Sequence, residues 1–151
     1  MEDTQNKELE QSVPIKELES SIINKINEFS QEIFNTLGSG YKEHVYVSAM
    51  CIHLREQNYL FGNEVIVPIE YKGIQLGYER ADIIIYEPIK CIIEFKAQTQ
   101  SLSKKEITQL KKYQNNLKIN CGILINFGNN NNKLEFQNIN ASDEKKTISI
   151  D

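Results

Sequence analysis

Apolar residues recur every three to four positions in the first third of the chain, which is the spacing of one face of an α-helix. This spacing predicts a helix of about 22 residues that starts near Pro14 and ends at the segment Gly38-Ser39-Gly40. A second helix is predicted from about Tyr41 to Asn58. The apolar face of the first helix consists of Leu18, Ile22, Ile26, Phe29, Ile33 and Leu37, and that of the second contains Tyr46, Ala49, Met50, His53 and Leu54.

Further along, the apolar residues form short runs instead, which are typical of β-strands. A third helix, capped by Ser101 or Ser103 and reaching to about Leu117, separates the later runs. The expected strands cover residues 64–71, 74–86 with a kink at Gly77, 90–97, 119–127 and, as a weak edge strand, 133–139. Since strands on both sides of a crossover helix form a mixed sheet with helices on its faces, the predicted fold class is α/β.

The 151 residues suit a single domain. We expect a disordered arm at 1–12, one folded domain over 13–139 and a polar tail at 140–151. The N-terminal segment has no signal-peptide pattern, and no apolar run approaches the ~20 residues of a membrane span. The 3 cysteines are far apart and odd in number, which suits a reducing compartment. These features predict a cytoplasmic protein that does not enter a membrane.

The net charge of −4 argues mildly against nucleic acid as a partner, because phosphate binding usually requires a basic surface. The charge is uneven, however, since residues 103–118 form a basic segment in which Glu106 is the single acid. The lysines of this segment are Lys104, Lys105, Lys111, Lys112 and Lys118. The segment is either a phosphate-binding surface or simply a solvated helix face.

Two apolar runs that should be buried strands carry charged residues, namely Asp82 in the first run and Glu94 and Lys96 in the second. Burying an unpaired charge is costly, so such residues are usually held by a metal, a partner or a reaction. Glu94 and Lys96 are two positions apart and therefore point to the same face of their strand. An Asp followed by Glu-x-Lys can bind a divalent cation and stabilise an attacked phosphate, which makes the chain a candidate nuclease.

Five segments together resemble the GxxExxY protein family, a branch of the PD-(D/E)XK nuclease-like superfamily. They are Gly40-Tyr41-Lys42-Glu43-His44-Val45-Tyr46, Gly77-Tyr78-Glu79-Arg80-Ala81-Asp82, Ile93-Glu94-Phe95-Lys96-Ala97, Gln109-x-x-x-Tyr113 and Gly122-Ile123-Leu124-Ile125-Asn126-Phe127-Gly128. The resemblance implies an αβββαβ restriction-endonuclease-like core, a mixed sheet flanked by helices, with an extra N-terminal helix. The resemblance supports the fold and the arrangement of the metal site more strongly than it supports any particular substrate.

The resemblance also implies roles for individual residues. Asp82 and Glu94 would bind Mg²⁺ or Mn²⁺, with Glu43 as a third acidic ligand in an arrangement similar to that of Holliday-junction resolvases. Lys96 would position the attacking water or stabilise the charge of the transition state. The substrate-binding residues would be Gln109, Tyr113, Lys105 and Lys112, and the substrate would be nucleic acid, preferentially DNA.

Several alternatives stay open at this point. Glu94 and Lys96 would also suit an ion pair on a half-exposed strand. Asp82 would also suit a pair with Arg80, and Glu43 would suit the positive end of a helix dipole. A non-catalytic nucleic-acid-binding or protein-interaction module with a vestigial site is the rival to the enzyme, and a homodimer or a protein partner is compatible with both.

The metal site makes one prediction about strand register. In an antiparallel hairpin, paired residues share a face, so Asp82 joins Glu94 only if paired residue numbers sum to an even value. Pairing Ile85 with Cys91 meets this condition, whereas pairing Glu87 with Lys90 separates the two carboxylates.

Overall fold

The computed structural model describes residues 13–129 and 131–143. Within that part, three α-helices and a five-stranded mixed sheet form an α/β fold with a restriction-endonuclease-like core and an extra N-terminal helix, as predicted. The helices are α2 (Ile15–Leu37), α3 (Glu43–Glu56) and α4 (Lys104–Leu117). The strands are β1 (Leu60–Tyr71), β2 (Ile74–Glu87), β3 (Cys91–Lys96), β4 (Cys121–Asn126) and β5 (Glu135–Asn140), followed by the short 3-10 helix η1 (Ala141–Asp143).

The strands lie in the order β1-β2-β3-β4-β5. β3 and β4 are parallel, and the other three neighbouring pairs are antiparallel. The parallel pair is connected through α4, which is the crossover helix expected from the sequence. β5 lies at the edge of the sheet, as predicted.

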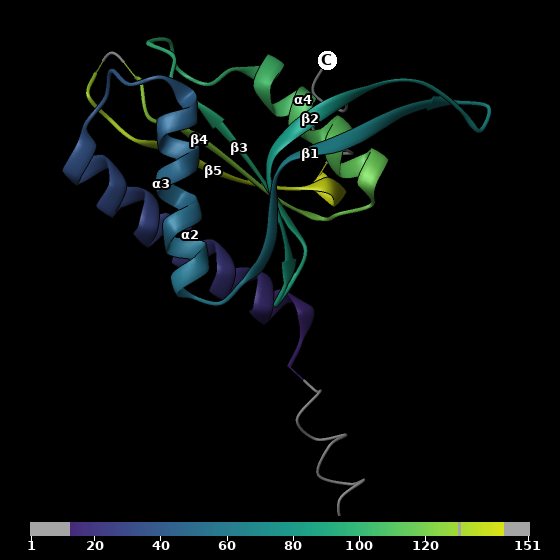
Figure 1. Cartoon of the computed structure of the whole chain (residues 1–151), viewed down its shortest axis with the longest axis horizontal. Coiled ribbons are helices and arrows are strands. Elements are labelled where there is room, and N and C mark those ends of the chain that lie inside the picture. The colour runs from purple at the N-terminus through teal and green to yellow at the C-terminus, as the bar shows by residue number, and fades with distance from the viewer. Residues whose placement is uncertain (1–12, 130, 144–151) are drawn as a thin grey trace, which may run out of the picture.

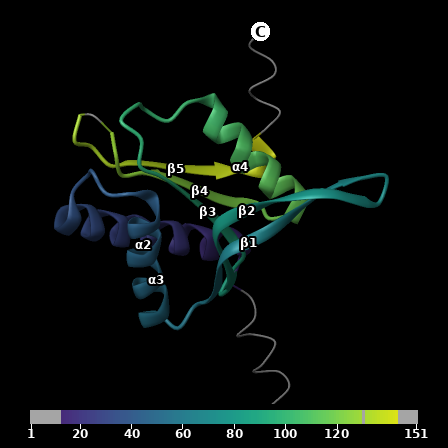
Figure 2. The ribbon, with the colours of Figure 1, turned by 45° about the horizontal axis from the view of Figure 1, so that its top comes forward.

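Each face of the sheet is covered by helices, because the central strands are apolar on both faces. α2 and α3 cover one face and pack on Ile83, Ile85 and Ile93, whereas α4 covers the other and packs on Ile84 and Ile92 (Figures 1 and 2). No helix among the described residues is long and apolar enough to span a membrane.

The last strand runs slightly past residue 139, the predicted end of the domain, and the domain bounds stay a prediction. β5 continues to Asn140, and the Ala141 N–H donates a hydrogen bond of 3.0 Å to the carbonyl of Asn120. Ile139 is buried beneath α4, which fixes this segment on the sheet. The predicted disordered segment at 1–12 and residues 144–151 of the predicted tail at 140–151 lie outside the described residues, and the assignment to a single domain stays a prediction.

The β1–β2 hairpin is much longer than the rest of the sheet. The two strands pair from Leu60 with Glu87 to Tyr71 with Ile74, whereas β2 pairs with β3 only over Ile83–Ile85. The remainder of the hairpin, residues 66–80, is here called the arm; its base packs on α4 through Val67, and its tip extends past the rest of the sheet (Figures 1 and 2). The predicted kink at Gly77 coincides with a register shift, because Ile69 pairs with Gly77 but Glu70 pairs with Gln75.

Candidate active site

The candidate site lies where β2 and β3 separate. Ile85 pairs with Cys91, which confirms the even register predicted for these strands. Beyond Ile83, two side-chain carboxyl groups accept hydrogen bonds from backbone N–H groups, as backbone carbonyls do in a regular strand pair. The Asp82 N–H donates a hydrogen bond of 2.9 Å to Glu94 Oε1, and the Phe95 N–H donates one of 2.8 Å to Asp82 Oδ2. These two bonds bring the carboxyl groups of Asp82 and Glu94 to the same place.

The two carboxyl groups carry an electrostatic cost. Glu94 is 6% exposed. Burial raises its pKa to about 9, and the charge of Asp82 contributes further in the same direction. Burial also raises the pKa of Asp82, although the hydrogen bond from the Phe95 N–H opposes this rise. At neutral pH the pair therefore retains a proton unless a cation compensates its charge.

Lys96 and Glu43 complete the set predicted from the sequence. Lys96 lies two positions after Glu94, and its positive charge partly offsets the rise that burial causes in the pKa values of Glu43, Asp82 and Glu94. Glu43 is an exposed residue in the first turn of α3, and its pKa is raised by burial and then by the charge of Asp82. The fold thus gathers the four predicted residues from one helix and two strands; their catalytic roles stay predictions.

Two alternative explanations of these charges are not borne out in the described part of the chain. Lys96 forms no ion pair within 4.0 Å there, so it is not neutralised by a direct bridge to Glu94. Arg80 forms none either, and its guanidinium lies 5.9 Å from the ring centre of Tyr78. Asp82 is therefore directed to β3 and not to Arg80.

A hollow of about 290 Å³ opens beside Asp82, between the start of α3 and the base of the β1–β2 hairpin. It is lined by Glu43, His44, Val47, Ser48, Asn63, Glu64 and Asp82. We call it the α3 hollow. Because both Glu43 and Asp82 line it, an ion or phosphate in this space would meet acidic groups from a helix and a strand.

The predicted substrate-binding residues lie on the opposite side, along α4. Gln109 Nε2 donates a hydrogen bond of 3.1 Å to the Tyr113 hydroxyl. Burial raises the pKa of Tyr113, and a hydrogen bond with Glu79 and the charge of Glu94 raise it further. The Tyr113 hydroxyl therefore lies near both acids. Tyr113 thus approaches the candidate site from the α4 side.

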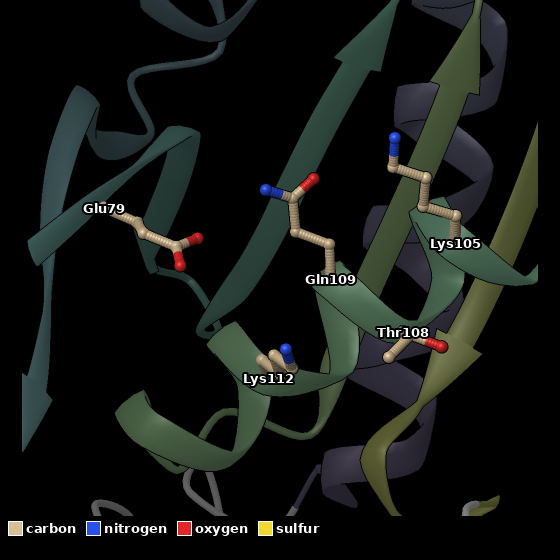
Figure 3. A pocket seen from close by; sticks show the side chains of 5 residues that line it. All are labelled: Glu79, Lys105, Thr108, Gln109 and Lys112. Atoms are coloured by element: carbon tan, nitrogen blue, oxygen red, sulfur yellow. The ribbon is translucent and has the colours of Figure 1, made fainter.

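A second hollow of about 350 Å³ separates α4 from the arm. It is lined by Glu79, Lys105, Thr108, Gln109 and Lys112, and we call it the α4 hollow. In Figure 3 the Glu79 side chain extends from the strand toward α4, while Lys105 and Gln109 stand along the helix. Lys105 and Lys112 are therefore the lysines of the basic segment that line this hollow.

The donor set is chemically suited to a hard divalent cation, since Mg²⁺ and Mn²⁺ prefer carboxylate oxygens. The hydrogen bonds of Asp82 and Glu94 already place two such groups together. Within residues 13–129 and 131–143, however, no three side chains of His, Cys, Asp or Glu are grouped closely enough to hold a metal ion. Glu43 would therefore have to move closer to the acidic pair to serve as a third ligand.

Tyr46, which belongs to the predicted apolar face of this helix and ends the first of the five segments, anchors the start of α3. Its hydroxyl donates a hydrogen bond of 2.7 Å to the Gly38 carbonyl and accepts one of 3.2 Å from the Tyr41 N–H. Its ring is fully buried and stacks on Phe127 at 4.4 Å. Because Glu43 lies one helical turn before Tyr46, these contacts fix the backbone that carries Glu43.

Asn126, at the end of β4, belongs to the fifth segment of the resemblance, but its role was not predicted from the sequence. Its Oδ1 accepts hydrogen bonds of 3.1 Å from the N–H groups of Gln98 and Gly128, and its Nδ2 donates one of 3.0 Å to Glu135. The side chain is buried and ties the segment after β3 to β4. The available signal was a polar residue within an otherwise apolar strand.

The fold and this site define a class: an α/β nuclease-fold protein whose acidic pair lies at the point where two central strands diverge. The family model of the PD-(D/E)XK nuclease superfamily matches residues 20–139, and the chain belongs to that superfamily. The solved structure of SSO0001 is similar, with 20% sequence identity, a TM-score of 0.49 and coverage of 72% of this chain. The chain spans 58% of the length of SSO0001. No curated protein matches the chain.

Proposed function

We propose that the chain is a metal-dependent nuclease that hydrolyses phosphodiester bonds of DNA. The carrying observation is the pair of hydrogen bonds that joins Asp82 and Glu94 where β2 leaves β3, with Glu43 and Lys96 close by. A buried acidic pair of this kind is costly to maintain, and a cation would offset the cost. The chain's order of sequence segments supports its placement in the GxxExxY branch of the superfamily.

Asp82 and Glu94 would hold Mg²⁺ or Mn²⁺, with Glu43 as the third ligand. Such an ion supplies polarisation of the phosphate and a lowered pKa for a bound water. The chain's own residues supply the remaining functions. The ammonium group of Lys96 stabilises negative charge that develops on the phosphate, and this contribution is greatest in the transition state.

The residues of α4 are proposed to hold the substrate. Lys105 and Lys112 line the α4 hollow and offer positive charge to the phosphate backbone. Gln109 and Tyr113 are hydrogen-bonded to each other near Glu79 and Glu94, where they would contact the nucleotide at the site.

A second candidate is a non-catalytic nucleic-acid-binding or protein-interaction module with the same fold. The absence of a three-ligand group among the described residues favours it, as does the net charge of −4. A homodimer or a protein partner would be compatible with either candidate.

A cleavage assay separates the two candidates. Purified protein with Mg²⁺ or Mn²⁺ is incubated with linear DNA, branched DNA and RNA, and we expect cleavage of DNA. Lys96→Ala should lose most of the turnover and retain substrate binding, because its charge acts chiefly in the transition state. Lys90→Ala is the matched control, since Lys90 is an exposed lysine in the turn before β3.

A second set of variants tests substrate binding. Changing Lys104, Lys105, Lys111 and Lys112 to Ser should weaken binding and flatten its salt dependence, because fewer counterions are released. Binding without cleavage on every substrate, together with no effect of Lys96→Ala, would favour the non-catalytic module. Cleavage that Lys96→Ala leaves unchanged would contradict the role proposed for this residue.

A further inference from the structure

Three residues of β2 form a row that leads outward from the candidate site. Every second side chain of a strand points to the same face, at intervals of about 6.6 Å, so Tyr78, Arg80 and Asp82 share a face. The β1–β2 register is constant from Val65↔Ala81 to Ile69↔Gly77, so Tyr78 and Arg80 stay on one face. The alternation changes beyond Asp82, because Ala81 and Ile84 both pack on the α4 side, and Asp82 itself lines the α3 hollow. The other face of β2 meets α4, where Glu79 lines the α4 hollow and Ala81 is buried.

Arg80 is available to bind an anion. Its side chain is exposed, and in the described part of the chain it has no carboxylate within 4.0 Å. Its guanidinium lies 5.9 Å from the ring centre of Tyr78. A guanidinium stacked on an aromatic ring retains N–H donors at its edge, and these match the oxygens of a phosphate.

Tyr78 belongs to an exposed, mainly apolar surface. Its own exposed fraction is 53%, and that of Ile66 is 52%. Across the hairpin, Arg80 pairs with Ile66 and Tyr78 pairs with Pro68. These four residues, here called the arm platform, combine an aromatic ring, a cation and aliphatic surface, which is the combination on which nucleic-acid bases stack.

We infer that the arm platform binds an unpaired nucleotide of the substrate beside the phosphate that is cut. Tyr78 stacks on the base, and Arg80 contacts a neighbouring phosphate. The inference rests on the proposed nuclease function and narrows its substrate to nucleic acid with a single-stranded segment, because bases within a duplex are already stacked on one another. Continuity with Asp82 and the uncompensated charge of Arg80 favour nucleic acid over a second copy of this chain as the occupant.

The test compares binding to a fluorescent oligo-dT strand and to a blunt DNA duplex by anisotropy, with the full chain and Ca²⁺ replacing Mg²⁺. Tyr78→Ala should weaken oligo-dT binding about tenfold, which corresponds to ~1.4 kcal/mol and lies within the range for one stacked base. Tyr78→Phe should retain wild-type affinity. Binding of Tyr78→Ala to the duplex should stay within about twofold of wild type, since no unpaired base is present.

Variants of Tyr78 and Arg80 should change different properties of binding. Arg80→Gln should lower the slope of log K against log salt by about 0.7, the value for one phosphate contact on a single strand, whereas Tyr78→Ala should leave the slope unchanged. Tyr71→Ala is the matched control, because Tyr71 is also exposed and lies 5.5 Å from Lys72 but at the far end of the arm. It should bind oligo-dT within about twofold of wild type.

Several outcomes would overturn the inference. If Tyr78→Ala weakens binding to both substrates equally, the platform does not select unpaired bases. If the wild type cleaves DNA and Tyr78→Ala binds oligo-dT normally, the inference fails while the proposed function stands. If the wild type neither binds nor cleaves, both fail. Sedimentation could instead show a concentration-dependent dimer that Tyr78→Ala abolishes while oligo-dT binding stays normal. That result would mean that the arm platform binds a second copy of the chain.

Discussion

Changing Glu94 to Gln separates the hydrogen-bonding role of this side chain from its charge. The amide oxygen of Gln can still accept the hydrogen bond that the Asp82 N–H donates to Glu94 Oε1 at 2.9 Å. The amide has no proton to release in this pH range, so the variant removes the titration at nearly constant shape. We expect the variant to be more stable than the wild type in metal-free solution at pH 8.

The magnitude follows from the pKa of Glu94, which is raised from 4.5 in its ordinary state to about 9 in the folded chain. Below pH 4.5 the carboxyl is protonated in both the folded and the unfolded chain, so the stabilisation is fully present. Between these two pKa values the folded chain binds the additional proton, and the free energy of unfolding falls by about 1.4 kcal/mol per pH unit. From pH 5 to pH 8 this group alone accounts for at most about 4 kcal/mol.

The assay is urea unfolding followed by circular dichroism at pH 5, 6, 7 and 8 in EDTA, for the wild type and Glu94→Gln. The difference between the two free energies of unfolding should grow in favour of Gln as the pH rises, since titratable groups distant from Glu94 contribute equally to both proteins. Glu28→Gln, a change of an exposed carboxylate on α2, is the control and should track the wild type. Parallel pH profiles for the wild type and Glu94→Gln would refute the argument.

Three further variants test the site and the packing around it. Mn²⁺ at ten times its Kd should raise the free energy of unfolding of the wild type by about 1.4 kcal/mol and that of Asp82→Asn by less, as measured in urea titrations; equal gains would place the ion elsewhere. Tyr46→Phe removes the hydrogen bonds with Gly38 and Tyr41 and should cost about 1–3 kcal/mol in the same titrations, and an unchanged midpoint would contradict the anchoring role. Gly128→Ala would place a Cβ atom 2.5 Å from the Ala97 carbonyl carbon and should cost about 1–3 kcal/mol; wild-type stability would show that the backbone relaxes freely.

The helices and the strand register were predictable because their signals are local. The apolar spacing of α2 has the helical period, and its predicted end at Gly38 is correct. Ser103, predicted as a possible cap, precedes α4, and its backbone N–H donates a hydrogen bond of 2.8 Å to Glu106. The even register of β2 and β3 followed from the requirement that Asp82 and Glu94 share a face, and the pairing confirms it.

Other features depend on contacts between distant segments, which local patterns do not encode. β1 begins at Leu60, earlier than predicted, because its first residues pair with the end of β2 although they include turn-forming Gly62 and Asn63. The network around Asn126 joins segments far apart in the sequence. The candidate site itself was accessible from the sequence because charged residues in apolar strands are costly and therefore conspicuous.

The hydrogen bonds of Asp82 and Glu94 give these residues a second task besides any chemistry. Each carboxyl group stands in for a backbone acceptor at the point where the ladder between β2 and β3 ends. An amide can fulfil that structural task, but it cannot supply the negative charge. Relatives that have lost catalysis should therefore carry Asn or Gln at these positions more often than Ala. The amides would remove the negative charge of the site and preserve the hydrogen bonds between β2 and β3.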